Sequence, residues 1–229
     1  MTVGSAIQSA ILRCIGTRPQ EVFASSQQEC VLMADIVQEA ASDIAKSADW
    51  RALTKIVTLN TAGVQSVPLP DDYDRMVVGS QVDDPGTWFW GYEPFPDVNT
   101  FMRYKTGSYQ ILSPGGWIIL GGEMQFWPAP SGQATFPYIS NLWARSDDGA
   151  LKKLFEADND TFVLSERLLT LALVWRYKEA TGLEYAEDQT SYDIALQQEM
   201  GRDRGSYLVR TPRSTGFGGK IAYTGRAIR

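Results

Sequence analysis

Three groups of closely spaced carboxylates are the residues of this sequence whose types and spacing could do chemistry. They are Asp71, Asp72 and Asp74; Asp83 and Asp84; and Glu156, Asp158 and Asp160. Neighbouring carboxylates can bind a divalent cation, or can divide general acid and general base roles between them. Each group, however, lies beside Pro or Gly or just before an expected helix, where Asp is favoured for turns and for the helix dipole. We therefore expect turn and capping roles, with no metal site and no catalytic site.

The sequence contains no histidine, and this excludes several catalytic classes at once. Ser/His/Asp and Cys/His nucleophilic sites, His-based acid–base catalysis and nearly every catalytic zinc site require that side chain. The two cysteines, Cys14 and Cys30, fall in stretches with helical periodicity, and we expect them to be buried free thiols. The glycines before Lys220 lack the spacing and the strand-loop-helix context of a phosphate-binding loop. We expect no cofactor and no enzymatic activity.

Positive charge is concentrated at the C-terminal end of the chain. All 27 Asp and Glu residues precede Arg204. The charged residues from there onward are Arg204, Arg210, Arg213, Lys220, Arg226 and Arg229, interleaved with Tyr207, Phe217, Ile221 and Tyr223. Such a segment can dock on an acidic protein groove, contact nucleic acid by charge and stacking, or remain a solvated tail without a role. We expect protein docking, because the acidic remainder of the chain would repel a phosphate backbone.

Apolar residues with helical spacing predict two helices before residue 52. The first runs from Ser5 to Ile15, has Ile at every fourth position and ends at Gly16. For the second we expect Ser26 as the N-cap, with Glu29 at the capping-box position. A narrow stripe of small apolar residues follows, and such a stripe packs against another helix at close range.

Helical spacing returns after residue 160 and predicts a second pair of helices. One opens at Ser165 and Glu166 and ends at Gly182, and the other runs from Glu184 to about Met200. Because the connection is so short, these two helices should lie antiparallel. The residues that we expect to form the seam between the two pairs are Cys30, Ala34, Val37, Ala41, Ile44, Leu168, Leu169, Ala172 and Trp175.

Between the helical pairs the sequence has the period of strands. Lys55 to Thr61 and Val64 to Leu69 alternate around an Ala62-Gly63 turn, which indicates a hairpin. Further aromatic and β-branched runs predict a small antiparallel sheet or sandwich; they span 75–82, 87–92, 109–112, 117–120, 124–127 and 135–143. A short helix is expected from Val98 to Tyr104. The tryptophans of this region could form a ligand platform, but sandwich cores also use aromatic residues.

The expected fold class is α+β, with an antiparallel helical bundle made from the N- and C-terminal helix pairs, an inserted antiparallel β lobe and an extended C-terminal tail. The expected domains are 1–52 for the first half of the bundle, 53–159 for the β lobe, 160–204 for the second half and 205–229 for the tail. No window is apolar over the length of a membrane span, and residues 1–16 lack the features of a secretory signal. We expect a protein that makes no membrane contact and stays in the cytoplasm where it is made.

Residues 161–192 resemble the C-terminal helical hairpin of the head-to-tail adaptor proteins of tailed bacteriophages. Two upstream phrases are also similar to that family: Asp49-Trp50-Arg51-Ala-Leu before the first strand, and Val67-Pro-Leu-Pro-Asp-Asp-Tyr-Asp-Arg75 at the entry to the β region. The order of helix pair, β insert, helix pair and tail matches as well. The resemblance therefore covers nearly the whole chain.

The resemblance implies a structural virion protein made in the host bacterial cytoplasm and located at the head–tail junction. It implies a ring of copies, expected to number twelve, that connects the portal vertex to the tail and forms part of the DNA ejection channel. The implied partners are the portal protein, tail nozzle or tail fibre proteins, other copies of the chain and DNA in passage, with the charged tail docking on the portal. The alternative is a non-enzymatic binding module whose β lobe recognises a ligand and whose basic tail recruits a protein or nucleic-acid partner.

Overall fold

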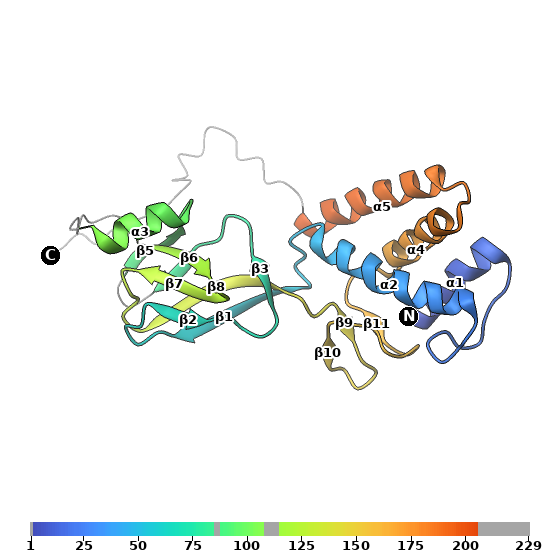
Figure 1. Cartoon of the computed structure of the whole chain (residues 1–229), viewed down its shortest axis with the longest axis horizontal. Coiled ribbons are helices and arrows are strands. Elements are labelled where there is room, and N and C mark those ends of the chain that lie inside the picture. Colours follow the sequence, from blue (N-terminus) through green and yellow to red (C-terminus); the bar gives the residue numbers. More distant parts are fainter. Residues whose placement is uncertain (1, 85–87, 108–114, 206–229) are drawn as a thin grey trace. The chain divides into compact units, whose positions relative to one another are not determined.

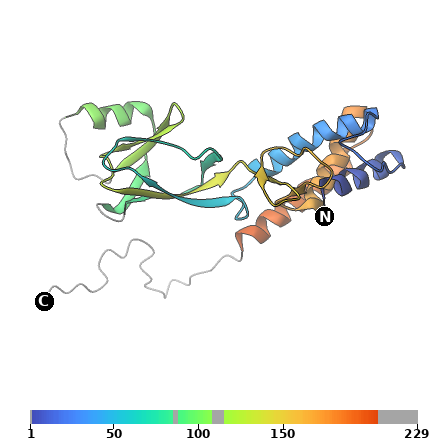
Figure 2. The same ribbon diagram turned by 90° about the horizontal axis from the view of Figure 1, so that it is seen from below.

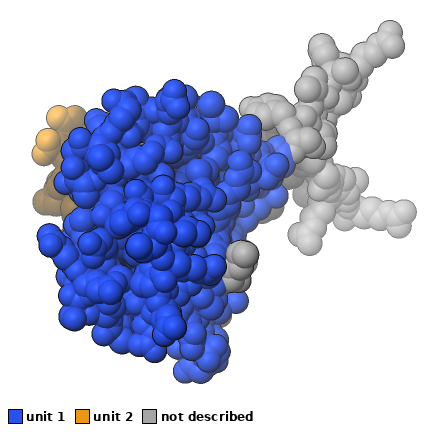
Figure 3. Space-filling model, turned by 90° about the vertical axis from the view of Figure 1, so that its right-hand side faces the viewer, with its two compact units in different colours: residues 1–57, 70–80, 137–205 blue, residues 58–69, 81–136, 206–229 orange. Residues whose placement is uncertain are grey.

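The computed structural model of the chain describes residues 2–84, 88–107 and 115–205. Within these ranges it has five helices and eleven strands, which confirms the α+β class (Figure 1). The chain forms two compact units: unit 1 contains residues 1–57, 70–80 and 137–205, and unit 2 contains 58–69 and 81–136 among the described residues. Figure 3 colours the two units. The strand expected at 109–112 and the tail beyond Gly205 lie outside the described residues.

Unit 1 contains four of the five helices, and α4 lies among the other three. They are α1 (Val3–Ile15), α2 (Gln28–Lys46), α4 (Glu166–Thr181) and α5 (Ala186–Arg204). Helix α4 packs against α1, α2 and α5, and residues from all four helices share one hydrophobic core (Figures 1 and 2). Small side chains such as Ala10 and Ala41, both completely buried, allow the helix backbones to approach closely.

The predicted helix ends of unit 1 are correct where glycine terminates the helix. Gly16 and Gly182 both adopt the left-handed conformation that ends α1 and α4. The predicted start of α2 is wrong, because Gln27 and not Ser26 is the N-cap residue, and it makes no side-chain capping bond. The backbone is still extended at Gln27, so the helix begins one residue beyond the position that a Ser26 cap requires.

A small three-stranded sheet completes unit 1. Its strands are β9 (Ala144–Arg145), β10 (Leu151–Lys152) and β11 (Thr161–Phe162), in the order β10-β9-β11. The loop before β11 covers the start of α1, where the amides of Val3 and Gly4 donate to the carbonyls of Asp160 and Asp158 at 2.6 and 3.0 Å. A Cβ at Gly4 would collide with the side chain of Asp158, so this contact requires glycine.

Eight further strands form one sheet with the order β1-β8-β4-β5-β6-β7-β2, and β3 pairs with β8. Their bounds are β1 (Thr54–Asn60), β2 (Ser66–Pro68), β3 (Tyr73–Met76), β4 (Val82–Asp84), β5 (Trp88–Pro94), β6 (Gly116–Leu120), β7 (Glu123–Trp127) and β8 (Gln133–Ser140). The expected hairpin of 55–61 with 64–69 is wrong, because β1 pairs with β8 and β2 pairs with β7. The amides of Thr61 and Ala62 donate instead to the carbonyl of Gly132, so the Ala62-Gly63 turn packs on the connection between β7 and β8.

The sheet is also not purely antiparallel, since β5 and β6 are parallel. The chain between these two strands includes helix α3 (Val98–Thr106), the predicted short helix, which packs on β6 and β7. Asp97 caps it by accepting the amide of Thr100 at 2.7 Å. At the start of β6, a Cβ on Gly116 would collide with the ring of Phe95, so glycine permits this close packing.

Candidate functional site

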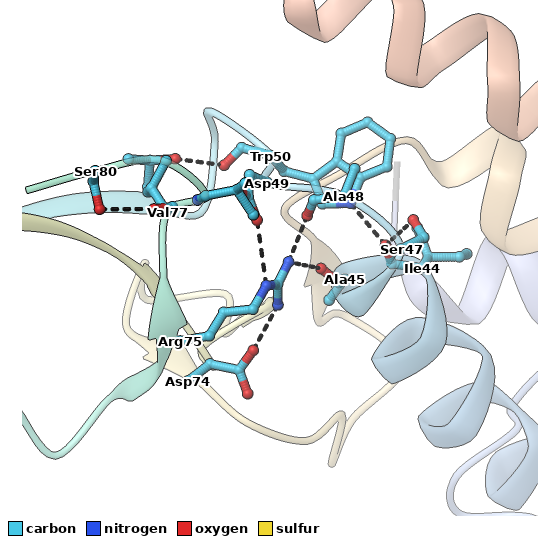
Figure 4. A network of polar contacts seen from close by, with 12 residues as sticks. Ile44, Ala45, Ser47, Ala48, Asp49, Trp50, Asp74, Arg75, Val77 and Ser80 are labelled. Atoms are coloured by element: carbon cyan, nitrogen blue, oxygen red, sulfur yellow. Dashed lines mark hydrogen bonds and ion pairs between the residues drawn. The ribbon is translucent and has the colours of Figure 1, made fainter. Parts of the chain in front are cut away.

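Arg75, on β3, is the centre of a polar network within unit 1 (Figure 4). Its guanidinium donates to Asp74 at 2.6 Å and to Asp49 at 3.3 Å. It also donates to the carbonyl oxygens of Ala48 and Ala45, at 2.7 and 3.5 Å. The planar fork of five donors makes it possible for one side chain to hold carboxylates and carbonyls at once. Arg75 therefore joins β3 to the C-terminal end of α2.

This network adds donors to backbone carbonyls at and just after the end of α2. The last carbonyls of a helix have no intrahelical donor and carry partial negative charge. Besides the Arg75 bonds, the indole nitrogen of buried Trp50 donates to the carbonyl of Ile44 at 2.7 Å. The second carboxylate oxygen of Asp49 accepts the amide of Val78 at 2.8 Å. Side chains that follow the helix in sequence thus fix the chain where it leaves α2.

Arg51 extends the same site to the end of α5. Its amide donates to the carboxylate of Asp203 at 3.1 Å, and its guanidinium donates to the carbonyl of Arg204 at 2.8 Å. Gly205 follows as the C-cap with positive φ. A cleft of about 510 Å³ lies beside these contacts and is lined by Lys46, Ser47, Ala48, Asp49, Arg75, Val78, Met200, Asp203 and Arg204. Its lining mixes both signs of charge: Asp49 and Arg75 bond to each other, and Asp49 and Asp203 accept backbone amides.

Asp72, one of the sequence-predicted candidates, is a second polar node of unit 1. It accepts hydrogen bonds from Lys55 at 2.6 Å, from the hydroxyl of Tyr138 at 2.8 Å and from Ser140 at 2.7 Å. Burial acts to raise the pKa of Asp72, but these donors outweigh it and hold the pKa below its ordinary value. Burial, together with the bond to Asp72, raises the pKa of Tyr138 to about 12. The carboxylate is an ionised structural acceptor that links β1 to β8.

The other candidate carboxylates also bind backbone amides. Asp84 accepts the amide of Ser131 at 3.0 Å, and Asp158 accepts those of Val22 and Phe23 at 3.0 and 3.3 Å. Asp160 accepts two amides of its own loop and pairs with Lys152 at 2.9 Å. Burial acts to raise the pKa of Asp160, but these bonds lower it by more, so the pKa lies below its ordinary value. Among the described residues no cluster of three or more His, Cys, Asp or Glu side chains is placed to hold a metal ion.

Most of the predicted seam residues lie in the core of unit 1. Those that are buried there are Cys30, Val37, Ala41, Ile44, Leu168, Leu169 and Ala172. Ala34 and Trp175 are half-buried; Trp175 packs beside Tyr185 and Tyr192, and the Arg176 guanidinium lies 5.0 Å from its ring centre. Met33, Ile36 and Ala40 are buried as well, because the packed face of α2 is wider than the stripe read from the sequence.

Of the predicted docking residues only Arg204 is described, and it is exposed at the end of α5. Arg210, Arg213, Phe217, Lys220, Ile221, Tyr223, Arg226 and Arg229 lie outside the described residues. The contact between Asp49 and Arg75 was not predicted, although both residues belong to the two phrases on which the family resemblance was based. The sequence contained a signal for this contact. An acidic residue, Asp49, follows the end of an expected helix, and a basic residue, Arg75, begins an expected strand.

The fold and its polar sites are those of a structural protein, an α+β chain in which Arg51, Arg75, Asp84, Asp158 and Asp160 bind backbone groups of the chain itself. The sequence model of the SU10 adaptor protein family matches residues 1–216, and the chain belongs to that family. It is therefore a structural adaptor protein of a bacteriophage particle, as the resemblance implied. No curated protein shows a significant match. Among the described residues no helix is long and apolar enough to cross a membrane.

Proposed function

We propose that the protein assembles as a ring, of twelve copies by expectation, at the head–tail junction of the virion. There it connects the portal protein to tail nozzle or tail fibre proteins and forms part of the channel through which DNA leaves. The observation that carries this proposal is the adaptor-family match over residues 1–216, nearly the full chain. The acidic balance of the sequence supports it, because an acidic channel wall does not retain DNA.

Within this proposal, 1–52 and 160–204 form an antiparallel helical bundle that builds the ring, and 53–159 is a lobe for contact with tail proteins. Residues 205–229 are the segment that docks on the portal. The contacts of Arg51 with Asp203 and Arg204 support the last assignment. They hold the end of α5, so that the segment after Gly205 starts from a fixed position in unit 1. Its cations and aromatic residues fit an acidic groove on the portal.

The absence of enzymatic activity and of a cofactor belongs to the same proposal. The candidate carboxylates Asp72, Asp84, Asp158 and Asp160 accept hydrogen bonds from the chain itself. A carboxylate held in this way is a poor general base, because its lone pairs already have donors.

Negative-stain microscopy of the purified chain, alone and mixed with purified portal rings, tests the proposal. We expect rings that stack on one end of the portal, and a variant that lacks 206–229 should still form the ring but should no longer bind the portal. Proteins that remain separate from the portal under all conditions, with no ring at any protein concentration, would contradict the proposal.

A further inference from the structure

A cleft of about 580 Å³ runs between α1 and α4 in unit 1. Its lining residues are Ser5, Ser9, Leu12, Arg13, Arg18, Glu166, Arg167, Thr170 and Leu171. Leu12 is 45% exposed although it is a large apolar side chain, and Leu171 is partly buried beside it. The cleft therefore combines accessible apolar side chains with charged ones. A surface of this kind is typical of a site for another protein segment.

The charge of the cleft is opposite to the charge of the chain. Arg13, Arg18 and Arg167 are all exposed, and none of them forms an ion pair with another residue in the described part of the chain. Arg18 donates to the amide oxygen of Gln8 at 3.3 Å, which leaves its charge uncompensated. The chain as a whole has a net charge of −6. Three unpaired arginines around apolar side chains are thus available to an acidic, partly apolar partner surface.

Helix α2 presents a surface with these properties on its solvent-exposed face. Val31, Asp35, Glu39 and Asp43 are spaced by four residues and are all exposed, so they form one stripe along the helix. Val31 is 57% exposed. Arg176 of the same chain pairs with Glu39 at 3.1 Å and with Asp43, while Asp35 forms no ion pair within the described residues. We call these four residues the acidic stripe.

The cleft and the acidic stripe of one copy do not meet. All nine residues that line the cleft come from α1, α4 and the loop that contains Arg18, and none comes from α2. An apolar side chain followed by a row of acids on one surface, and apolar side chains beside arginines on another, are complementary in both charge and polarity. Two different patches that match each other join copies head to tail, and such contacts generate rings when the rotation between copies closes.

We propose that the cleft between α1 and α4 binds the acidic stripe of α2 from a second copy of this chain. Leu12 and Leu171 pack against the partner's Val31, while Arg13, Arg18 and Arg167 face the partner's Asp35 and Glu39. The inference rests on the proposed ring and names the two surfaces that join its subunits. A nucleic-acid backbone is a poorer occupant, since it would leave the apolar side chains of the cleft uncovered.

Charge reversal tests this pairing in a way that a loss of folding cannot imitate. The variants are Arg167→Glu in the cleft and Asp35→Arg in the stripe, and mass photometry measures their assembly. Alone, each variant places like charges across every contact. We expect the protein concentration at which half of the chains are assembled to rise at least about tenfold. Mixed in equal amounts, the two variants can alternate around a ring with opposite charges at every contact. We therefore expect the mixture, and a chain that carries both substitutions, to reach half-assembly at a protein concentration within about threefold of the wild-type value.

Arg103→Glu and Asp193→Arg are matched controls, because they make the same charge changes at exposed positions on α3 and α5. They should assemble like the wild type. Normal assembly of Arg167→Glu and Asp35→Arg, or weak assembly of their mixture, overturns the inference while leaving the ring intact. A wild-type chain that stays monomeric even with portal present overturns the ring itself. If Arg167→Glu loses binding to a labelled DNA duplex while its assembly is unchanged, the cleft is a nucleic-acid site and the inference is overturned.

Discussion

Removal of the Arg75 side chain should destabilise unit 1 more than any ordinary surface substitution. Arg75→Ala deletes the bonds to Asp74 and Asp49 and those to the carbonyls of Ala48 and Ala45. Hydrogen bonds to charged groups contribute about 1.5–3 kcal/mol each. The three charged side chains are 29%, 23% and 28% exposed, so solvent screens part of this contribution. We expect a loss of about 2–3 kcal/mol in the free energy of unfolding.

Urea denaturation is the suitable assay, because urea does not screen charges as guanidinium does. Arg75→Lys should lose about 1–2 kcal/mol, since a single ammonium cannot span the carboxylates and the helix carbonyls together. A double-mutant cycle with Asp49→Asn should give a coupling of about 1 kcal/mol. The matched control is Arg103→Ala, an exposed arginine on α3, with an expected change within about 0.5 kcal/mol. An Arg75→Ala variant no less stable than this control would refute the role assigned to the network.

Three further outcomes follow from the packing, the titratable groups and the C-terminal segment. Ala41→Glu places a charge at a completely buried position and should cost about 3–5 kcal/mol, seen as a large drop in Tm; an unchanged Tm would mean that the seam is not packed as described. Burial raises the pKa of Tyr73, Tyr92 and Tyr138 to about 12 from a value near 10, so the stability that the protonated tyrosines contribute is complete below about pH 10 and is lost as the pH rises toward 12. The free energy of unfolding, measured by urea denaturation between pH 9 and pH 12, should therefore fall by up to about 3 kcal/mol for each tyrosine. A flat profile would contradict these assignments. Deletion of 206–229 should leave a folded protein that no longer attaches to portal-bearing heads, whereas normal attachment in a co-sedimentation assay would remove this segment from the docking mechanism.

Local sequence signals predicted the helices well because helix ends depend on nearby residues. Gly16 and Gly182 terminate helices through their own backbone conformation, and the period of apolar residues reveals a packed face. The start of α2 was misplaced by a similar local rule, since a serine at the correct distance from Glu29 does not force the chain into a helix. Capping preferences identify a helix start only to within a residue or two.

Strand pairing could not be predicted in the same way, because it depends on partners distant in sequence. The alternating runs around Ala62-Gly63 look like a hairpin, yet β1 and β2 find their partners in β8 and β7. The network of Arg75 with Asp49 likewise joins residues 26 positions apart, and each partner alone resembles an ordinary surface charge. Such contacts are fixed by the packing of whole elements, for which a single sequence contains no direct signal.

The most direct test of the adaptor account is a cryo-electron microscopy reconstruction of the head–tail junction of the phage that encodes this chain. The account predicts a ring of copies between the portal and the tail, with the helices of unit 1 in contact between neighbours and residues beyond Gly205 in contact with the portal. Complete, tailed particles without density for this chain at the junction would contradict it.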